Sequence, residues 1–254
     1  MFPCSIIDSS PAGALTPVVP GRTGTRSKAE FPSPQVLSRR LDDETLSAHP
    51  PGMVEVKICG LTNVDDAVRC VEAGADAIGL NFWPRSPRCV DVPTARAIVQ
   101  ATGDRATMVG VFVDLSLEQV REILRETGVL WAQLHGDESP ELVAELLPTA
   151  YKAIGVKDGS AIELARRYPG EHLLLDASVP GMPGGTGRTF DWDIAAAVAN
   201  ERKLTLAGGL NPDNVAEAIR AVNPFRVDVA SGVEMAPGKK DPARVQAFIT
   251  TAKN

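Results

Sequence analysis

Two residues with reactive side chains each close a short apolar run of this sequence. Cys59 ends the first such run and is followed directly by Gly60, and Asp176 ends a run of three leucines. In parallel α/β barrels, residues at the carboxyl ends of strands line the mouth where chemistry occurs. A thiol there can be a base, a nucleophile or packing. A carboxylate there is costly to bury, so Asp176 is either a general acid with a raised pKa or a cap or salt-bridge acceptor.

Other polar side chains follow two further apolar runs. Gln133 and His135 alternate at the end of one run and therefore share a face. His135 is a candidate base, ligand or hydrogen-bonded core residue, and one histidine at a strand end cannot make a His-rich metal site. Arg85 and Arg88 lie in a proline-stiffened loop. Their guanidinium groups suit a carboxylate or a phosphate, and the alternative is a solvated basic loop.

Glycine-rich segments follow the last two apolar runs. Gly208 and Gly209 come after one, and Ser231 and Gly232 come after the other. Glycines let the backbone approach an anion, and barrels often bind phosphate in the loops after strands seven and eight. The alternative for each loop is an ordinary tight turn. A third glycine-rich segment, residues 180–188, is predicted to be a mobile lid.

The elements that position these residues follow a regular alternation from Val54 onward. The sequence predicts eight strands, at residues 54–58, 77–82, 108–113, 131–135, 151–154, 173–176, 204–207 and 226–229. A predicted helix follows each strand, at residues 64–73, 92–101, 116–126, 139–147, 159–167, 191–199, 212–222 and 242–252. Alternation of this kind is typical of parallel βαβ units.

The predicted helices begin with capping signals. Ser116 and Gln119 have the spacing of a capping box. Ser139, Asn211 and Asp241 each precede a proline that suits the first helical position. Eight units in about 200 residues predict a single (β/α)8 TIM barrel of the α/β class. An open doubly wound sheet is less compatible, because the first strand lacks a nucleotide-binding glycine fingerprint.

The composition limits the classes of function. The chain has 254 residues, of which 44% are hydrophobic and 23% charged, as in ordinary globular proteins with one large core. Its formal net charge of −6 argues against general nucleic-acid binding but allows an anionic small molecule. No apolar run approaches the roughly 20 residues that span a membrane. The four scattered cysteines include no C-x-x-C pair, which disfavours a disulfide scaffold or a structural zinc site.

Residues 1–52 differ from the rest of the chain. They are rich in Pro, Ser and Thr, lack apolar periodicity and carry balanced charges. We predict a disordered extension there and a barrel domain at residues 53–254. The segment lacks the central apolar stretch of a secretory signal. An organelle transit peptide and a misassigned start, with Met53 as the true initiator, are the alternatives.

Six segments of the predicted barrel carry distinctive motifs, at residues 57–62, 133–136, 184–192, 208–215, 227–234 and 237–241. Together they resemble the phosphoribosylanthranilate isomerases of tryptophan biosynthesis, over residues 54–254. The resemblance implies a cytoplasmic aldose–ketose isomerase, a monomer or homodimer, that acts on a phosphorylated small molecule without cofactor or metal. The implied reaction is the Amadori rearrangement of N-(5-phosphoribosyl)anthranilate to 1-(2-carboxyphenylamino)-1-deoxyribulose 5-phosphate.

The resemblance also implies roles for individual residues. Cys59 corresponds to the family's catalytic base and Asp176 to its catalytic acid, and Arg88 faces the anthranilate moiety. The other implied substrate-binding residues are Gln133, His135, Gly208, Gly209, Ser231 and Gly232, of which the last four belong to the phosphate loops. The family often has serine where this chain has Ala207 and Ala230. A hydroxyl contact to phosphate is therefore in doubt, whereas backbone donors are retained.

The chemistry fits these residues independently of the resemblance. An acid opens the furanose ring by protonating its oxygen, and a base then removes the C2′ proton of the resulting imine. A ribulose-phosphate epimerase type would need several metal-ligating histidines. An indole-glycerol-phosphate synthase type would need lysine and glutamate at strand ends, and a dual-substrate sugar isomerase would have aspartate in place of Cys59. A non-catalytic phosphate-binding barrel would have no use for both an acid and a thiol.

Overall fold

The computed structural model describes residues 54–177 and 191–254, which contain a closed barrel of eight parallel strands. The strands are β1 (Glu55–Cys59), β2 (Ala77–Asn81), β3 (Thr107–Phe112), β4 (Trp131–Leu134), β5 (Ala150–Val156), β6 (His172–Ala177), β7 (Lys203–Leu206) and β8 (Arg226–Val229). Each strand pairs with the next, and β8 pairs with β1 to close the sheet. The predicted (β/α)8 TIM barrel is confirmed.

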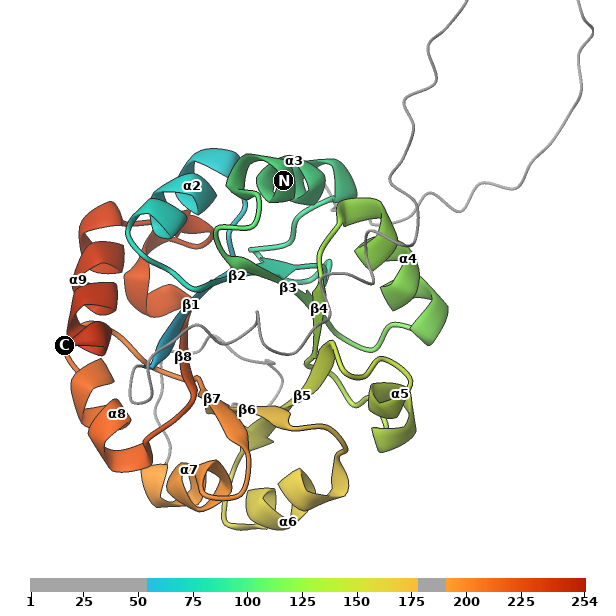
Figure 1. Cartoon of the computed structure of the whole chain (residues 1–254), viewed down its shortest axis with the longest axis vertical. Coiled ribbons are helices and arrows are strands. Elements are labelled where there is room, and N and C mark those ends of the chain that lie inside the picture. The colour runs from blue at the N-terminus through green and yellow to red at the C-terminus, as the bar shows by residue number, and fades with distance from the viewer. Residues whose placement is uncertain (1–53, 178–190) are drawn as a thin grey trace, which may run out of the picture. The chain divides into compact units, whose positions relative to one another are not determined.

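Helices form a ring outside the barrel (Figure 1). They are α2 (Val64–Glu72), α3 (Val92–Thr102), α4 (Leu117–Thr127), α5 (Pro140–Ala144), α6 (Ser160–Arg167), α7 (Trp192–Ala199), α8 (Val215–Val222) and α9 (Pro242–Lys253). Each predicted strand and helix has its counterpart, although α5 is much shorter than predicted. None of the helices in the described ranges is both long enough and apolar enough to cross a membrane.

Strand alternation divides the side chains between two environments. Val56 and Ile58 of β1 are fully buried and belong to the large apolar core that also contains residues of the surrounding helices. Lys57 and Cys59 alternate with them and therefore face the barrel interior. The interior has only a small apolar cluster, which includes Tyr151. The barrel is thus held from outside by apolar packing, while its interior is free to hold polar groups.

Most of the capping predictions are confirmed. The Ser116 side chain and the Gln119 side chain make the reciprocal bonds of a capping box. Ser139 and Asp241 cap α5 and α9 through their side chains, each with a proline in the first turn. The predicted cap at Asn211 is wrong. The Asn211 side chain instead accepts from Asp213 N at 2.8 Å and stabilises a turn, so that α8 begins later, at Val215.

Three short elements after β8 were not predicted. They are the 3-10 turn η1 (Ser231–Val233) and the two-stranded hairpin β9 (Glu234–Ala236) and β10 (Lys239–Lys240). The hairpin is too short to show a periodic pattern in the sequence. The predictions of a disordered extension at residues 1–52 and of a lid at 180–188 fall outside the described residues.

Candidate active site

The carboxyl ends of the strands enclose a cavity of about 430 Å³. We call this cavity the mouth. All but one of the predicted site residues line it, namely Cys59, Arg88, Gln133, His135, Asp176, Gly208, Gly209 and Ser231. The exception, Gly232, lines an adjoining cavity of about 580 Å³ that shares Gly209, Leu210 and Ser231 with the mouth. The structure therefore brings the predicted residues together in two connected spaces.

Cys59 occupies the last position of β1 and is a half-buried free thiol. Burial raises the pKa of this thiol above its ordinary value and the Asp228 carboxylate adds to the increase, which the nearby ammonium groups of Lys57 and Lys240 only partly offset. Lys240 also donates to the Cys59 carbonyl at 2.7 Å, which fixes the end of the strand. The other described free thiol, Cys70, belongs to the outer core and is 1% exposed. Cys70 therefore serves packing.

The neighbouring strand makes room for the Cys59 thiol. Gly79 of β2 pairs with Cys59, and a β-carbon at position 79 would lie 2.6 Å from Sγ and 3.0 Å from the Cys59 Cα. Contacts this short require the cysteine to move. Gly79 is therefore a positioning residue for the thiol that inspection of strand ends alone does not reveal.

Gly79→Ala is expected to lower kcat by about 10- to 100-fold, because small displacements of a reacting group have effects of that size. Gly159→Ala is the matched control, since a β-carbon there meets nothing within 4 Å. Steady-state kinetics of both variants, with circular dichroism to confirm folding, measure the effect. An unchanged kcat in Gly79→Ala would show that the thiol position is not important for the rate.

Asp176 is the penultimate residue of β6 and is 4% exposed. Burial raises its pKa to about 7, and the carboxylate of Asp228 adds to this increase. The Asp176 carboxyl group therefore holds a proton at neutral pH in a large fraction of molecules. Gly208, at φ +90°, passes so close that a β-carbon there would lie 2.8 Å from Asp176 Oδ1. The glycine after β7 thus serves close packing against the acid.

His135 follows β4 and lies beside Asp176, with 3.6 Å between His135 Nε2 and Asp176 Oδ2. Burial lowers the pKa of His135 to about 3, and the ammonium groups of Lys152 and Lys57 contribute. The imidazole is therefore neutral at physiological pH. Its Nδ1 lies 2.9 Å from Gln133 Nε2. The prediction that Gln133 and His135 share a face is confirmed.

Lys57 and Asp228 are polar groups at the base of the mouth that the sequence analysis did not assign. Lys57 is fully buried, and its Nζ lies 2.7 Å from Asp228 Oδ2 and 3.1 Å from Gln133 Oε1. Asp228 Oδ1 is buried without a hydrogen bond to another described residue. The sequence did contain a signal for Lys57, because this residue precedes Cys59 by two positions and must share its face of the strand.

Arg88 lies at the mouth, but its guanidinium is already paired. Its Nε and Nη2 donate to the two carboxylate oxygens of Glu234 at 2.8 and 2.7 Å. Glu234 also accepts from Lys240 at 2.9 Å. Burial raises the pKa of Glu234, but Arg88 and Lys240 lower it below its ordinary value. Because Gly60 has no β-carbon, the Arg88 side chain can pack directly on the turn after β1.

On the side that faces the barrel, backbone groups and not charged side chains line the adjoining cavity. Gly209, Ser231 and Gly232 donate no backbone hydrogen bond to any residue within 54–177 or 191–254. Gly232 is packed so tightly that a β-carbon would lie 2.0 Å from the Leu210 carbonyl oxygen. Free N–H groups in a tight glycine-containing loop are a typical anion site. Within the described ranges, no group of three or more His, Cys, Asp or Glu side chains is placed to hold a metal ion.

The fold and the mouth together define a (β/α)8 barrel of the kind that carries enzyme active sites at its strand ends, with a carboxyl group and a thiol at the mouth beside a glycine-containing loop pair. The family model for N-(5'-phosphoribosyl)anthranilate isomerase matches residues 56–251. The chain therefore belongs to the N-(5'-phosphoribosyl)anthranilate isomerase family.

Individual relatives agree with this assignment. N-(5'-phosphoribosyl)anthranilate isomerase from Myxococcus xanthus is 47% identical over 206 residues, covering 79% of this chain and 97% of that protein. The crystal structure of phosphoribosyl anthranilate isomerase from Thermotoga maritima is 42% identical, with a TM-score of 0.73, covering 79% of this chain and 99% of that one.

A further solved structure is that of a phosphoribosyl anthranilate isomerase in complex with reduced 1-(o-carboxyphenylamino)-1-deoxyribulose 5-phosphate. It is 40% identical, with a TM-score of 0.71, and covers 79% of this chain and 99% of that one. The chain is an aldose–ketose isomerase of tryptophan biosynthesis, which converts phosphoribosylanthranilate to the corresponding carboxyphenylamino-deoxyribulose phosphate.

Proposed function

We propose that Cys59 and Asp176 carry the two proton transfers of this isomerisation. The observation that supports the assignment is that both line the mouth, from strands β1 and β6, and that Asp176 has a pKa near 7. A group with that pKa can give up a proton at neutral pH without a large energetic cost. The Cys59 thiol is a second group with a titratable proton at a strand end beside the cavity.

The proposed reaction begins at the ribose ring oxygen. Asp176 donates its proton to that oxygen, and the ring C–O bond breaks as the lone pair of the anthranilate nitrogen forms a C=N bond to the anomeric carbon, which gives a protonated imine. The imine makes the neighbouring C2′ proton acidic. The Cys59 thiolate removes that proton to give an enolamine, which tautomerises to the ketone. The ammonium of Lys57 favours the thiolate that this step requires.

The remaining residues would hold the two ends of the substrate. Gly209, Ser231 and Gly232 offer backbone N–H groups to the phosphate, with Gly208 keeping this loop against Asp176. Arg88 would receive the anthranilate carboxylate through the part of its guanidinium that Glu234 leaves free. Gln133 and His135 would contact the substrate between these ends.

The wider context of the activity is part of the same proposal. Residues 53–254 would form the catalytic domain, which the family match at residues 56–251 supports. The protein would act in the cytoplasm as a monomer or homodimer, without nucleic acid as a partner.

The function is tested by following the conversion of phosphoribosylanthranilate by the full chain in excess EDTA. Turnover is expected to continue at the rate seen without EDTA, because every proposed step is a proton transfer between protein and substrate. Loss of turnover that a divalent cation restores would overturn the metal-free mechanism. Absence of turnover under both conditions would overturn the assigned reaction.

A further inference from the structure

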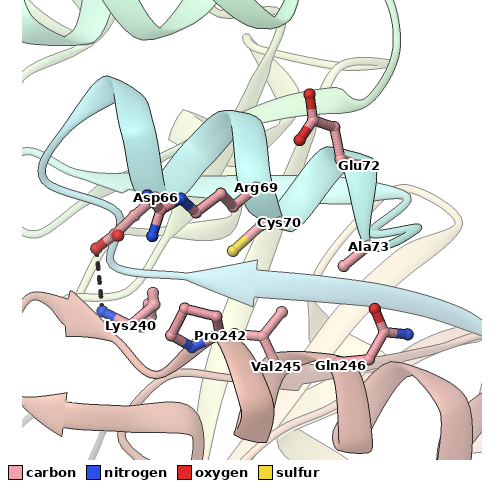
Figure 2. A pocket seen from close by; sticks show the side chains of 9 residues that line it. All are labelled: Asp66, Arg69, Cys70, Glu72, Ala73, Lys240, Pro242, Val245 and Gln246. Carbon is pink, nitrogen blue, oxygen red and sulfur yellow. Dashed lines mark hydrogen bonds between the residues drawn. The ribbon is translucent and has the colours of Figure 1, made fainter.

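A separate cavity of about 250 Å³ lies away from the mouth, between α2 and α9 (Figure 2). Burial raises the pKa of the Cys70 thiol beside it to about 12, so this thiol is no nucleophile. Asp66 there already accepts from Lys240 N at 3.0 Å. The polar groups beneath the mouth, by contrast, include several that the two proton transfers do not use.

These groups form one continuous chain of contacts across the barrel. Asp228 holds Lys57 at 2.7 Å, and Lys57 donates to Gln133 Oε1 at 3.1 Å. The Tyr151 hydroxyl donates to the same oxygen at 3.0 Å. Gln133 Nε2 then lies 2.9 Å from His135 Nδ1, and the other imidazole nitrogen faces Asp176.

The chain of contacts determines which way the Gln133 amide points. An ammonium group has donors only, so the Gln133 atom that it contacts must be the carbonyl oxygen. Burial alone lowers the pKa of Lys57, but the Asp228 carboxylate helps to raise it above its ordinary value, so the donor is charged at neutral pH. The reversed amide would place its NH2 group against the Lys57 ammonium, which is repulsive. The amide nitrogen therefore faces His135.

The amide orientation in turn determines the tautomer of the imidazole. An NH2 group donates, so His135 Nδ1 must accept and can carry no proton. The single proton of the neutral ring then lies on Nε2. That nitrogen is the one that faces Asp176 Oδ2, at 3.6 Å.

We propose that Lys57 and Gln133 are positioning residues that fix His135 in the Nε2–H tautomer, so that this N–H stabilises the Asp176 carboxylate formed when the acid gives up its proton. The inference rests on the proposed role of Asp176 as the acid. While Asp176 is protonated, the 3.6 Å contact is loose. Once the carboxylate forms, the contact becomes a charge-assisted hydrogen bond, and such bonds shorten and strengthen. The opposite tautomer would place a lone pair against the new charge.

The first test observes the tautomer directly. The chain has only three histidines, His49, His135 and His172. In protein labelled with ¹⁵N-histidine, protonated and unprotonated ring nitrogens resonate far apart, and the signals that His135→Gln removes belong to His135. We expect Nδ1 to be unprotonated and Nε2 to be protonated. A wild-type His135 protonated on Nδ1 overturns the proposal while leaving the assignment of Asp176 as acid untouched.

The second test reverses the tautomer. Gln133→Glu keeps the size of the side chain and its acceptor toward Lys57, but it offers His135 a carboxylate oxygen in place of an NH2 group. His135 is expected to become protonated on Nδ1, and kcat is expected to fall by about 10- to 100-fold, the range for one hydrogen bond to a charged group. KM should change little, and the His172 signals should not move. A reversed tautomer with unchanged kcat, or an unchanged tautomer, overturns the proposal.

A matched pair at position 135 keeps the proposal testable if Gln133→Glu does not fold. His135→Gln retains an N–H donor that can reach Asp176, whereas His135→Met has similar bulk and no donor. We expect the glutamine variant to be about 10-fold more active or better than the methionine variant. Equal activities would overturn the proposal. Full activity of Asp176→Asn would instead overturn the proposed acid, and the tautomer measurements would still stand.

Discussion

Asp176→Asn is expected to lower kcat by about 10²- to 10⁴-fold, the usual contribution of a general acid. Asparagine has nearly the same shape as aspartic acid but cannot transfer a proton to the ring oxygen of the substrate. KM is expected to change little, because the phosphate loops and Arg88 do not depend on this carboxyl group. Steady-state kinetics at pH 7 measure the effect, and a kcat within about threefold of the wild-type value would contradict the acid role.

The same substitution is expected to stabilise the protein at neutral pH. The Asp176 pKa is raised from 3.8 to about 7 in the folded state, so the wild type loses stability as the pH rises from about 4 to about 7. Asparagine does not ionise and avoids this loss. Above pH 7 the difference in the free energy of unfolding is expected to be about 1–4 kcal/mol in favour of the variant.

Urea denaturation at pH 4 and at pH 8 measures this difference. It is expected to be small at pH 4, where the wild-type carboxyl group is protonated in the folded state and only partly ionised in the unfolded state. Asp104→Asn is the matched control, because it makes the same substitution at an exposed position. Equal stabilities of wild type and Asp176→Asn at pH 8 would contradict the raised pKa. A stabilised but inactive variant would be a clear case of function maintained at a cost in stability.

The outward faces of the barrel explain why so much of the fold was predictable. Residues such as Val56 and Ile58 face an apolar core, so their spacing repeats with the period of a strand, and the helices that cover them repeat with the helical period. The rule that function gathers at strand ends then selects Cys59, His135 and Asp176. All three line the mouth.

The contacts within the barrel could not be predicted in the same way. Lys57 meets Gln133 across 76 positions and Asp228 across 171, and these meetings depend on strand order and register. The pairing of Arg88 with Glu234 across 146 positions has the same origin. Register is fixed by closure of the whole barrel, and no local pattern carries it. The start of α8 was mispredicted because Asn211 has two uses, as a helix cap or as a turn residue, which spacing does not distinguish.

Cys59→Ser is expected to lower kcat by about 10²- to 10⁴-fold, with little change in KM or in the free energy of unfolding. A hydroxyl group is far harder to deprotonate than a thiol, so the serine cannot supply the base that removes the C2′ proton. The thiol itself depends on its surroundings, because burial and the Asp228 carboxylate raise its pKa, and the ammonium groups of Lys57 and Lys240 oppose that increase without cancelling it.

The position of the thiol allows a sharp control for this prediction. Cys70→Ser removes the other described free thiol, which is buried in the outer core, and it should leave kcat nearly unchanged even where it lowers stability. Steady-state kinetics of both variants, together with thermal unfolding, separate the loss of a base from the loss of a packed sulfur. If Cys59→Ser kept most of its activity, the proton would have to leave C2′ by way of Asp176 alone. The Lys57 ammonium beneath the mouth would then be present to balance Asp228 and not to favour a thiolate.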